Sequence, residues 1–141
     1  MKPNRSVPSS TVIPVLVYPD VRAAVDWLSA AFGFAERLRI GDSHRSQLRV
    51  GDGDLVVTEP GGHRQPPLAG ESSQTVMIRV EDAQAHCERA RANGARILME
   101  PTDQMFGERQ YTAEDPVGHR WTFTQTLMDV DPADWGGQLK P

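Results

Sequence analysis

The sequence contains only one cysteine, Cys87, among its 141 residues. A single cysteine excludes an intrachain disulfide and any zinc cluster built on several thiolates. Apolar runs are short, and none approaches the roughly 20 residues of a membrane-spanning helix. The first ten residues, MKPNRSVPSS, also lack the apolar segment of a signal peptide. We therefore expect a cytoplasmic protein that has no membrane partner.

Blocks of basic residues are missing as well. The chain has 15 Lys and Arg residues against 19 Asp and Glu residues, which gives a formal net charge of −4. Both signs are spread along the chain, so no basic patch is available to follow a phosphate backbone. We expect no nucleic acid partner. The length and the 38% hydrophobic content predict one compact domain with a core.

The sequence does contain an internal repeat. Residues 15–33 and 76–94 share one order, which is an apolar strand, an aspartate that caps a helix, an amphipathic helix and a glycine. Asp20 precedes Gly33 by 13 residues, and Asp82 precedes Gly94 by 12. Three further strands are predicted after each helix, at 34–40, 44–50 and 54–59 and again at 95–100, 109–114 and 119–126.

The repeat predicts an α+β protein of two tandem β-α-β-β-β modules in a single domain. The modules cover about residues 11–60 and 75–126, with first strands at 11–18 and 75–80. Residues 61–74, rich in Gly, Pro and Ser, are predicted to be a linker that could contribute to a pocket rim. Residues 127–141 are predicted to form a C-terminal surface arm. A single helix cannot bury enough of the apolar surface of one module's sheet, so the two modules must associate.

The segment FGERQYTAEDPVGHRWTFTQ, residues 106–125, predicts two strands joined by an Asp115-Pro116-x-Gly118 turn. Together with IPVLVYPDVRAAVDWLSAAFGF and SQLRVGDGDLVVTE, it resembles the vicinal oxygen chelate superfamily, and most closely its PhnB-like, glyoxalase-like branch. That superfamily includes glyoxalase I, extradiol dioxygenases, and fosfomycin- and bleomycin-resistance proteins. The resemblance covers about residues 12–125. It implies a curved mixed sheet around a cleft, a homodimer and a small organic molecule as partner.

Metalloenzymes of this superfamily hold a divalent ion with His, Glu or Gln side chains from four strands. The resemblance places Ile13, Thr58, Thr75 and Thr122 at these four positions. None of these is a good ligand for Zn, Ni, Mn or Fe, so we expect no metal and no other cofactor. The alternative is a metal site that includes Glu59 and His44. Glu59 is one residue from its expected place, and such an offset on a strand reverses the face.

The last predicted strand shows what a ligand pocket would contain. Trp121 and Phe123 alternate with Arg120, Thr122 and Thr124, so the aromatic face should pack beneath the helices. The opposite face should line the cleft and hold an organic ligand through hydrogen bonds. The predicted ligand-binding residues are Arg109, Tyr111, Arg120, Thr122, Thr124 and His44.

Some of these residues also have a structural interpretation. Arg109 and Tyr111 could instead make surface pairs across neighbouring strands. His44 is a weaker candidate than the others, because it is included only for a possible position at the pocket mouth. Cys87 lies on the core-facing side of the second predicted helix, so it is expected to be a small core residue. No catalytic residue is assigned.

These patterns predict a metal-independent protein that binds a small molecule and sequesters a drug or metabolite, as bleomycin-resistance proteins do. The first alternative is a divalent-metal-dependent lyase, isomerase or dioxygenase of the same superfamily. A second alternative is a regulatory or interaction module that binds no ligand. The residues do not identify the ligand, and they do not show whether the modules pair within one chain or between chains.

Overall fold

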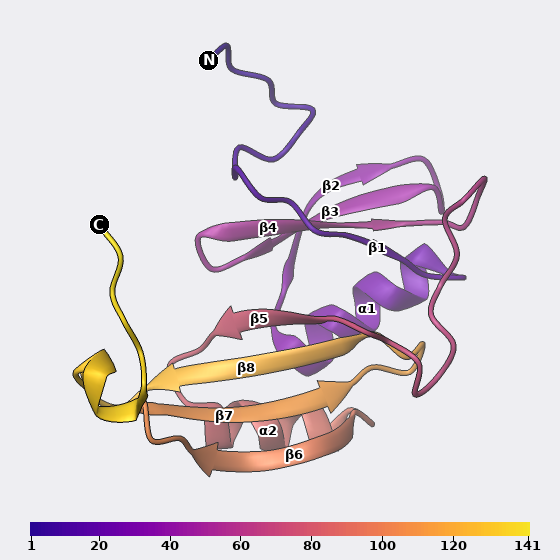
Figure 1. Cartoon of the computed structure of the whole chain (residues 1–141). Coiled ribbons are helices and arrows are strands. Elements are labelled where there is room, and N and C mark those ends of the chain that lie inside the picture. Colours follow the sequence, from indigo (N-terminus) through magenta and orange to yellow (C-terminus); the bar gives the residue numbers. More distant parts are fainter.

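The computed structural model describes all 141 residues and contains two four-stranded sheets, two α-helices and one short 3-10 helix (Figure 1). Neither α-helix is long and apolar enough to cross a membrane. The elements are β1 (Val15–Val17), α1 (Val21–Phe32), β2 (Ala35–Ile40), β3 (Arg45–Val50), β4 (Gly53–Thr58), β5 (Thr75–Arg79), α2 (Ala83–Ala92), β6 (Arg96–Asp103), β7 (Glu108–Glu114), β8 (Arg120–Thr126) and η1 (Pro132–Trp135).

The two sheets have the same topology. The first has the strand order β1-β4-β3-β2 and the second β5-β8-β7-β6. In each sheet the first strand is parallel to the last strand of its module, and the other pairs are antiparallel. The predicted α+β class with two β-α-β-β-β modules is therefore confirmed. Figure 1 shows β1 and β5 as the facing edges of the two sheets.

Local sequence signals define both helices. Asp20 and Asp82 are the N-caps, and their carboxylates accept hydrogen bonds of 3.0 Å from the backbone N–H of Ala23 and Ala85. Helix α1 ends at Gly33, whose φ of 78° is the left-handed conformation that glycine adopts without strain. Strand β1 is shorter than the predicted 11–18, and its pairing begins where the N–H of Val56 donates to Pro14 O.

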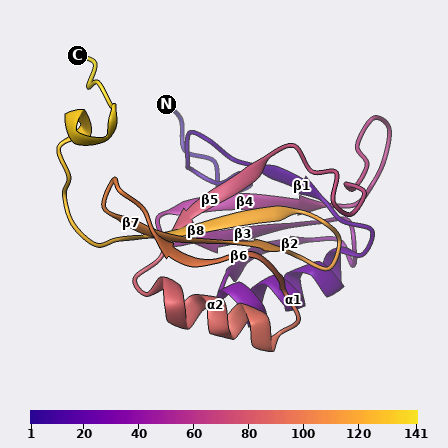
Figure 2. The same cartoon turned by 60° about the horizontal axis from the view of Figure 1, so that its bottom comes forward.

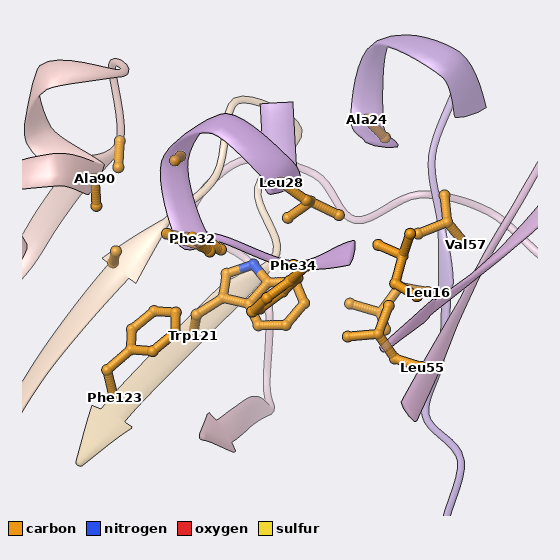
Figure 3. Close-up of a cluster of buried hydrophobic side chains, with 14 of the residues drawn as sticks. Leu16, Ala24, Leu28, Phe32, Phe34, Leu55, Val57, Ala90, Trp121 and Phe123 are labelled. Atoms are coloured by element: carbon orange, nitrogen blue, oxygen red, sulfur yellow. The ribbon is translucent and has the colours of Figure 1, made fainter. Parts of the chain in front are cut away.

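Both helices cover the same side of the two sheets (Figure 2). Beneath them Trp121 and Phe123 of β8 are fully buried, and the ring of Phe32 from α1 lies 5.5 Å and 4.7 Å from theirs (Figure 3). The prediction for the aromatic face of the last strand is confirmed. Cys87 of α2 is also fully buried in this core, as expected for a small core residue.

The modules pack together within one chain through their helices. The Arg89 side chain of α2 donates to the carbonyl oxygens of Ser29 and Ala30 in the last turn of α1, at 3.1 Å and 2.8 Å. The Trp27 indole donates to Asn93 O at 2.8 Å. These contacts satisfy groups that helix ends otherwise leave unpaired. A single hydrophobic core cluster contains residues from both modules.

The C-terminal arm contains η1, a 3-10 helix that was not expected from the sequence. Trp135 at its end lies 5.2 Å, centroid to centroid, from the Phe106 ring. The indole therefore packs on the loop before β7 of the same chain.

Candidate functional site

Each sheet has one face that the helices leave uncovered, called here the open face. On the second sheet, strand register places Arg120, Thr122 and Thr124 on this face, opposite to Trp121 and Phe123. Neighbouring strands add further polar side chains to the same face. These are Thr75 and Arg79 from β5 and Glu108, Gln110, Thr112 and Glu114 from β7.

Three threonines meet at the centre of the second open face. The hydroxyl oxygen of Thr122 lies 3.0 Å from that of Thr75 and 3.2 Å from that of Thr112. Thr75 and Thr122 are two of the four residues that the sequence resemblance places at metal-ligand positions. Neutral threonine hydroxyls bind divalent metals poorly, whereas they donate and accept hydrogen bonds readily. The donor set at this point suits an organic ligand better than a metal ion.

A second polar network surrounds Glu108. Thr124 donates to the Glu108 carboxylate at 2.7 Å and accepts from the Gln110 amide at 3.1 Å. The Arg79 guanidinium lies 3.4 Å from the same carboxylate. Burial raises the pKa of Glu108, but the hydrogen bonds from Thr124, Thr126 and Arg79 outweigh it and leave the pKa below its ordinary value. Glu108 is therefore an ionised acceptor on this face.

Arg120 lies where the linker approaches the second open face. Its guanidinium donates to Gly70 O at 3.2 Å and lies 3.5 Å from the Glu114 carboxylate. One oxygen of that carboxylate is buried and has no hydrogen-bond partner. The linker thus forms one border of the polar surface that Arg120 and Glu114 share.

Two of the predicted ligand-binding residues lie on the other side of the sheet. Tyr111 pairs with Phe123 across the strands and is fully buried, and its ring stacks on Phe123 at 5.0 Å. Arg109 pairs with Gln125 and forms a 2.6 Å ion pair with Asp103. The expectation that Arg109 and Tyr111 add a charge and an aromatic wall to the cleft was wrong, because the register places odd-numbered β7 residues on the helix side.

The sequence argument missed the residues that replace them. Gln110 pairs with Thr124, and Thr112 pairs with Thr122, so both lie on the second open face. The signal was present in the alternation of β7, but it could be used only once the register between β7 and β8 was known. A shift of one residue exchanges the two faces of a strand.

His44 and Glu59, the weak alternative for a metal site, do lie together. The His44 Nδ1 atom is 2.7 Å from Glu59 Oε1, and both side chains are about half exposed. Both lie just beyond the strands, His44 in the turn before β3 and Glu59 directly after β4, and the position of His44 at a pocket mouth stays a prediction. No group of three or more His, Cys, Asp and Glu side chains is arranged to hold a metal ion.

The first open face is crossed by the N-terminal segment, residues 5–13. The Arg37 guanidinium donates to Arg5 O and the Gln47 amide donates to Ser6 O, both at 2.8 Å. Pro8 is buried against the sheet. Figure 2 shows this segment on the side away from the helices. A cavity of about 270 Å³ lies between residues 6–8 and the strands.

A wider cavity of about 350 Å³ follows the seam between β1 and the linker. Val15 and Val17 form one wall, and Glu71 and Gln74 contribute to the other. His119 also borders it and makes a 2.7 Å hydrogen bond with Val17 O. The linker therefore forms part of a pocket wall on the uncovered side of the molecule.

A buried carboxylate fixes the two modules relative to each other. Asp115 Oδ1 accepts three backbone N–H groups of the turn, from Val117, Gly118 and His119, at 3.0 to 3.1 Å. Its Oδ2 accepts from the Tyr18 hydroxyl at 2.5 Å and from the Trp121 indole at 3.1 Å. The sequence predicts only the role of Asp115 in the turn. The bond to Tyr18 adds a link between the residue that follows β1 and the turn between β7 and β8.

The fold agrees with the comparison to known families. The family model described as the Glyoxalase/Bleomycin resistance protein/Dioxygenase superfamily matches residues 11–123. The chain belongs to this superfamily.

Solved structures also resemble this chain. TioX from Micromonospora sp. ML1 is 35% identical, with a TM-score of 0.70, and the match covers 84% of this chain and 100% of that one. The fosfomycin resistance protein FosX from Mesorhizobium loti has a TM-score of 0.64 at 14% identity, over 86% and 96% of the two chains, and shares the fold alone.

Relatives known from sequence occur in mycobacteria. A protein from Mycobacterium tuberculosis H37Rv is 28% identical over 128 residues, which cover 84% of this chain and 75% of the relative. A protein from Mycobacterium bovis has the same identity over 84% of each chain. Both are described as uncharacterized.

Proposed function

We propose that this chain is a metal-independent member of the superfamily that binds a small organic molecule and sequesters a drug or metabolite. The observation that carries the proposal is the pair of hydroxyls of Thr75 and Thr122, 3.0 Å apart where metalloenzymes of the fold carry ligands. Thr58 and Ile13 at the other two positions supply no metal ligand either. Sequestration requires only affinity and slow release, so it needs no metal.

Hydrogen-bonding groups of the second open face support this function. Thr112 and Thr122 offer hydroxyls, Gln110 an amide, and Arg120 a cation, on adjacent strands. Two cavities elsewhere on the uncovered side of the molecule have volumes of about 350 and 270 Å³, which suits a small organic ligand. Fixed polar groups beside apolar walls are the usual composition of a ligand pocket.

The protein is further proposed to act as a homodimer. Val15 and Met77 lie on the two open faces and are 48% and 58% exposed. The opposite faces of the two sheets are buried under the helices of the same chain. A second copy placed over the open faces would bury them and deepen the cleft. Sedimentation analysis tests this assembly.

We also propose that the chain belongs to the PhnB-like branch of the superfamily. We propose a cytoplasmic location as well, with which the single, buried cysteine agrees.

A divalent-metal-dependent lyase, isomerase or dioxygenase is the second candidate, and the observation that favours it is the His44–Glu59 pair. Two exposed donors form half of the usual ligand set. The alternative therefore requires further ligands from a second copy of the chain.

Binding measurements with and without EDTA distinguish the two candidates. The untagged protein is titrated calorimetrically with a panel of organic molecules that includes bleomycin and fosfomycin. The proposal predicts that at least one compound binds, that EDTA leaves its affinity unchanged, and that Thr122→Val weakens it. Thr102→Val is the matched control, because this hydroxyl donates to Glu100 O of its own strand. Binding that appears only after a divalent metal is added would favour the second candidate.

A further inference from the structure

We propose that the cavity beneath the N-terminal segment takes a small organic carboxylate, with Arg45 as the group that binds its charge. This inference rests on the proposed binding function and specifies the class of ligand. The cavity has a volume of about 270 Å³. Since an apolar cavity of about 150 Å³ accepts benzene, this space suits a body of about two rings.

The walls of this cavity are mostly apolar, and its polar lining consists of Ser6, Gln47 and one cation, Arg45. Val15, Ile40 and Val56 form the floor on the first sheet, and Val7 and Pro8 belong to the roof. No acidic residue lines the space. A ligand with an apolar body therefore finds matching walls, and its polar group must be recognised by the side chains at the edge.

Arg45 is the charged side chain of this cavity, and it has no ion pair or hydrogen bond in the structure. Its Nε atom is buried without a hydrogen-bond partner. Arg37 on the same face is fully engaged in comparison, since it donates to Gln47 and to Arg5 O. An unpaired guanidinium beside apolar walls is costly, and a carboxylate would accept two of its N–H groups at once.

Thr58 supplies a second and independent observation. It pairs with Arg45 across the strands, on the same open face, and it is fully buried. Its hydroxyl has no hydrogen-bond partner. Buried hydroxyls are almost always paired, so this one is an unsatisfied polar group beside Arg45, although Thr58 itself does not line the cavity. An oxyanion beside the guanidinium would satisfy both side chains after a small adjustment.

The N-terminal segment that forms the roof of the cavity is held to the first sheet by hydrogen bonds. The roof is held by the Gln47 amide, which donates to Ser6 O at 2.8 Å, and by Ser10, which donates to Asp54 at 2.6 Å. A bound ligand would contact the roof and the floor at the same time. The N-terminal segment would then become more tightly held when the cavity is filled.

The test uses 1-naphthoate and the uncharged 1-naphthamide as probes in calorimetric titrations of the full chain. We expect naphthoate to bind, Arg45→Met to weaken it at least about tenfold, and naphthamide to bind weakly and equally to both proteins. Arg49→Met is the matched control, because Arg49 lies on the same strand and face but pairs with Asp54. Arg45→Lys, which keeps the cation, should retain part of the affinity.

Three outcomes would overturn the assignment. These are equal binding of the two probes to the wild type, unchanged naphthoate binding in Arg45→Met, and no naphthoate binding. If neutral compounds still bind and Thr122→Val weakens them, the proposed function survives while the carboxylate assignment fails. Trypsin provides the second measurement, because naphthoate should slow cleavage after Arg5 several-fold. Unchanged cleavage at saturating naphthoate would contradict the location under the segment.

Discussion

The hydroxyl oxygens of Thr75 and Thr122 lie 3.0 Å apart on adjacent parallel strands. Thr122 also lies 3.2 Å from the Thr112 hydroxyl, so it contacts a hydroxyl on each neighbouring strand. We predict that Thr122→Val destabilises the fold by about 1 kcal/mol, because Thr75 and Thr112 lose their shared partner, and that Thr75→Val costs less, because Thr122 keeps its contact with Thr112. The double variant should cost less than the sum of the two.

A double-mutant cycle from urea unfolding measures this coupling. The pair Thr102→Val and Thr75→Val is the control, since their hydroxyls do not bond to each other. Strictly additive costs for Thr75 and Thr122 would show that the hydroxyl pair does not form.

Tyr18 and Asp115 should contribute more to stability than a hydrogen bond between neutral groups. Tyr18→Phe removes a buried donor to a carboxylate, with an expected cost of about 1.5 to 3 kcal/mol. Tyr111→Phe is the matched comparison, because the Tyr111 hydroxyl bonds to the neutral imidazole of His86, at an expected cost of about 0.5 to 1.5 kcal/mol. Equal costs in urea unfolding would argue against a stronger hydrogen bond at Asp115 than at His86.

His86 should make stability depend on pH. Its Nε2 atom carries the proton, because the carbonyl of Phe32, 3.1 Å away, can only accept. Nδ1 therefore accepts from the Tyr111 hydroxyl, and once protonated it can no longer accept this bond. Burial lowers the pKa of His86 from its ordinary value of 6.5, although the Phe32 carbonyl partly offsets the shift.

This depressed pKa sets the direction in which stability changes with pH. The unfolded chain binds the proton at a higher pH than the folded one, so the contribution is present above about pH 6.5 and is lost as the pH falls through the folded pKa. We predict that the stability advantage of the wild type over His86→Gln shrinks between about pH 7.5 and pH 5. Urea unfolding across this range checks it, and a constant difference would refute the depressed pKa.

Gly107 should be far less tolerant of alanine than Gly51. Both have positive φ, 88° and 59°, so both substitutions carry a backbone cost of about 1 kcal/mol. A Cβ on Gly107 would also lie 2.3 Å from Met128 O, whereas one on Gly51 would meet nothing within 4 Å. We expect Gly107→Ala to cost at least about 2 kcal/mol more in thermal or urea unfolding. Similar costs would mean that the C-terminal arm does not hold the Met128 carbonyl against Gly107.

Features set by neighbouring residues could be predicted from the sequence. Asp20 and Asp82 begin the helices because a carboxylate reaches the N–H groups of the next turn, and this signal is local. The alternation of Trp121 and Phe123 with threonines is equally local, since side chains on a strand point to opposite faces in turn.

Features set by long-range pairing could not be predicted. The face of Tyr111 depends on its register with Phe123, and the bond from Tyr18 to Asp115 joins residues 97 positions apart. Nothing in the first thirteen residues indicates that they cross the first sheet, because the anchoring groups on Arg37 and Gln47 are long polar side chains typical of any surface strand. The cavity beside Arg45 follows from that crossing and was missed with it.

Metal content of the untagged protein tests the central claim most directly. The protein is purified without chelators or affinity metals and measured by inductively coupled plasma mass spectrometry, with Glu59→Ala and His44→Ala variants alongside. We predict less than about 0.1 equivalent of Zn, Ni, Mn or Fe per chain in all three proteins, because Ile13, Thr58, Thr75 and Thr122 supply no ligand. About one equivalent of any of these metals in the wild type, lost in Glu59→Ala, would contradict the account.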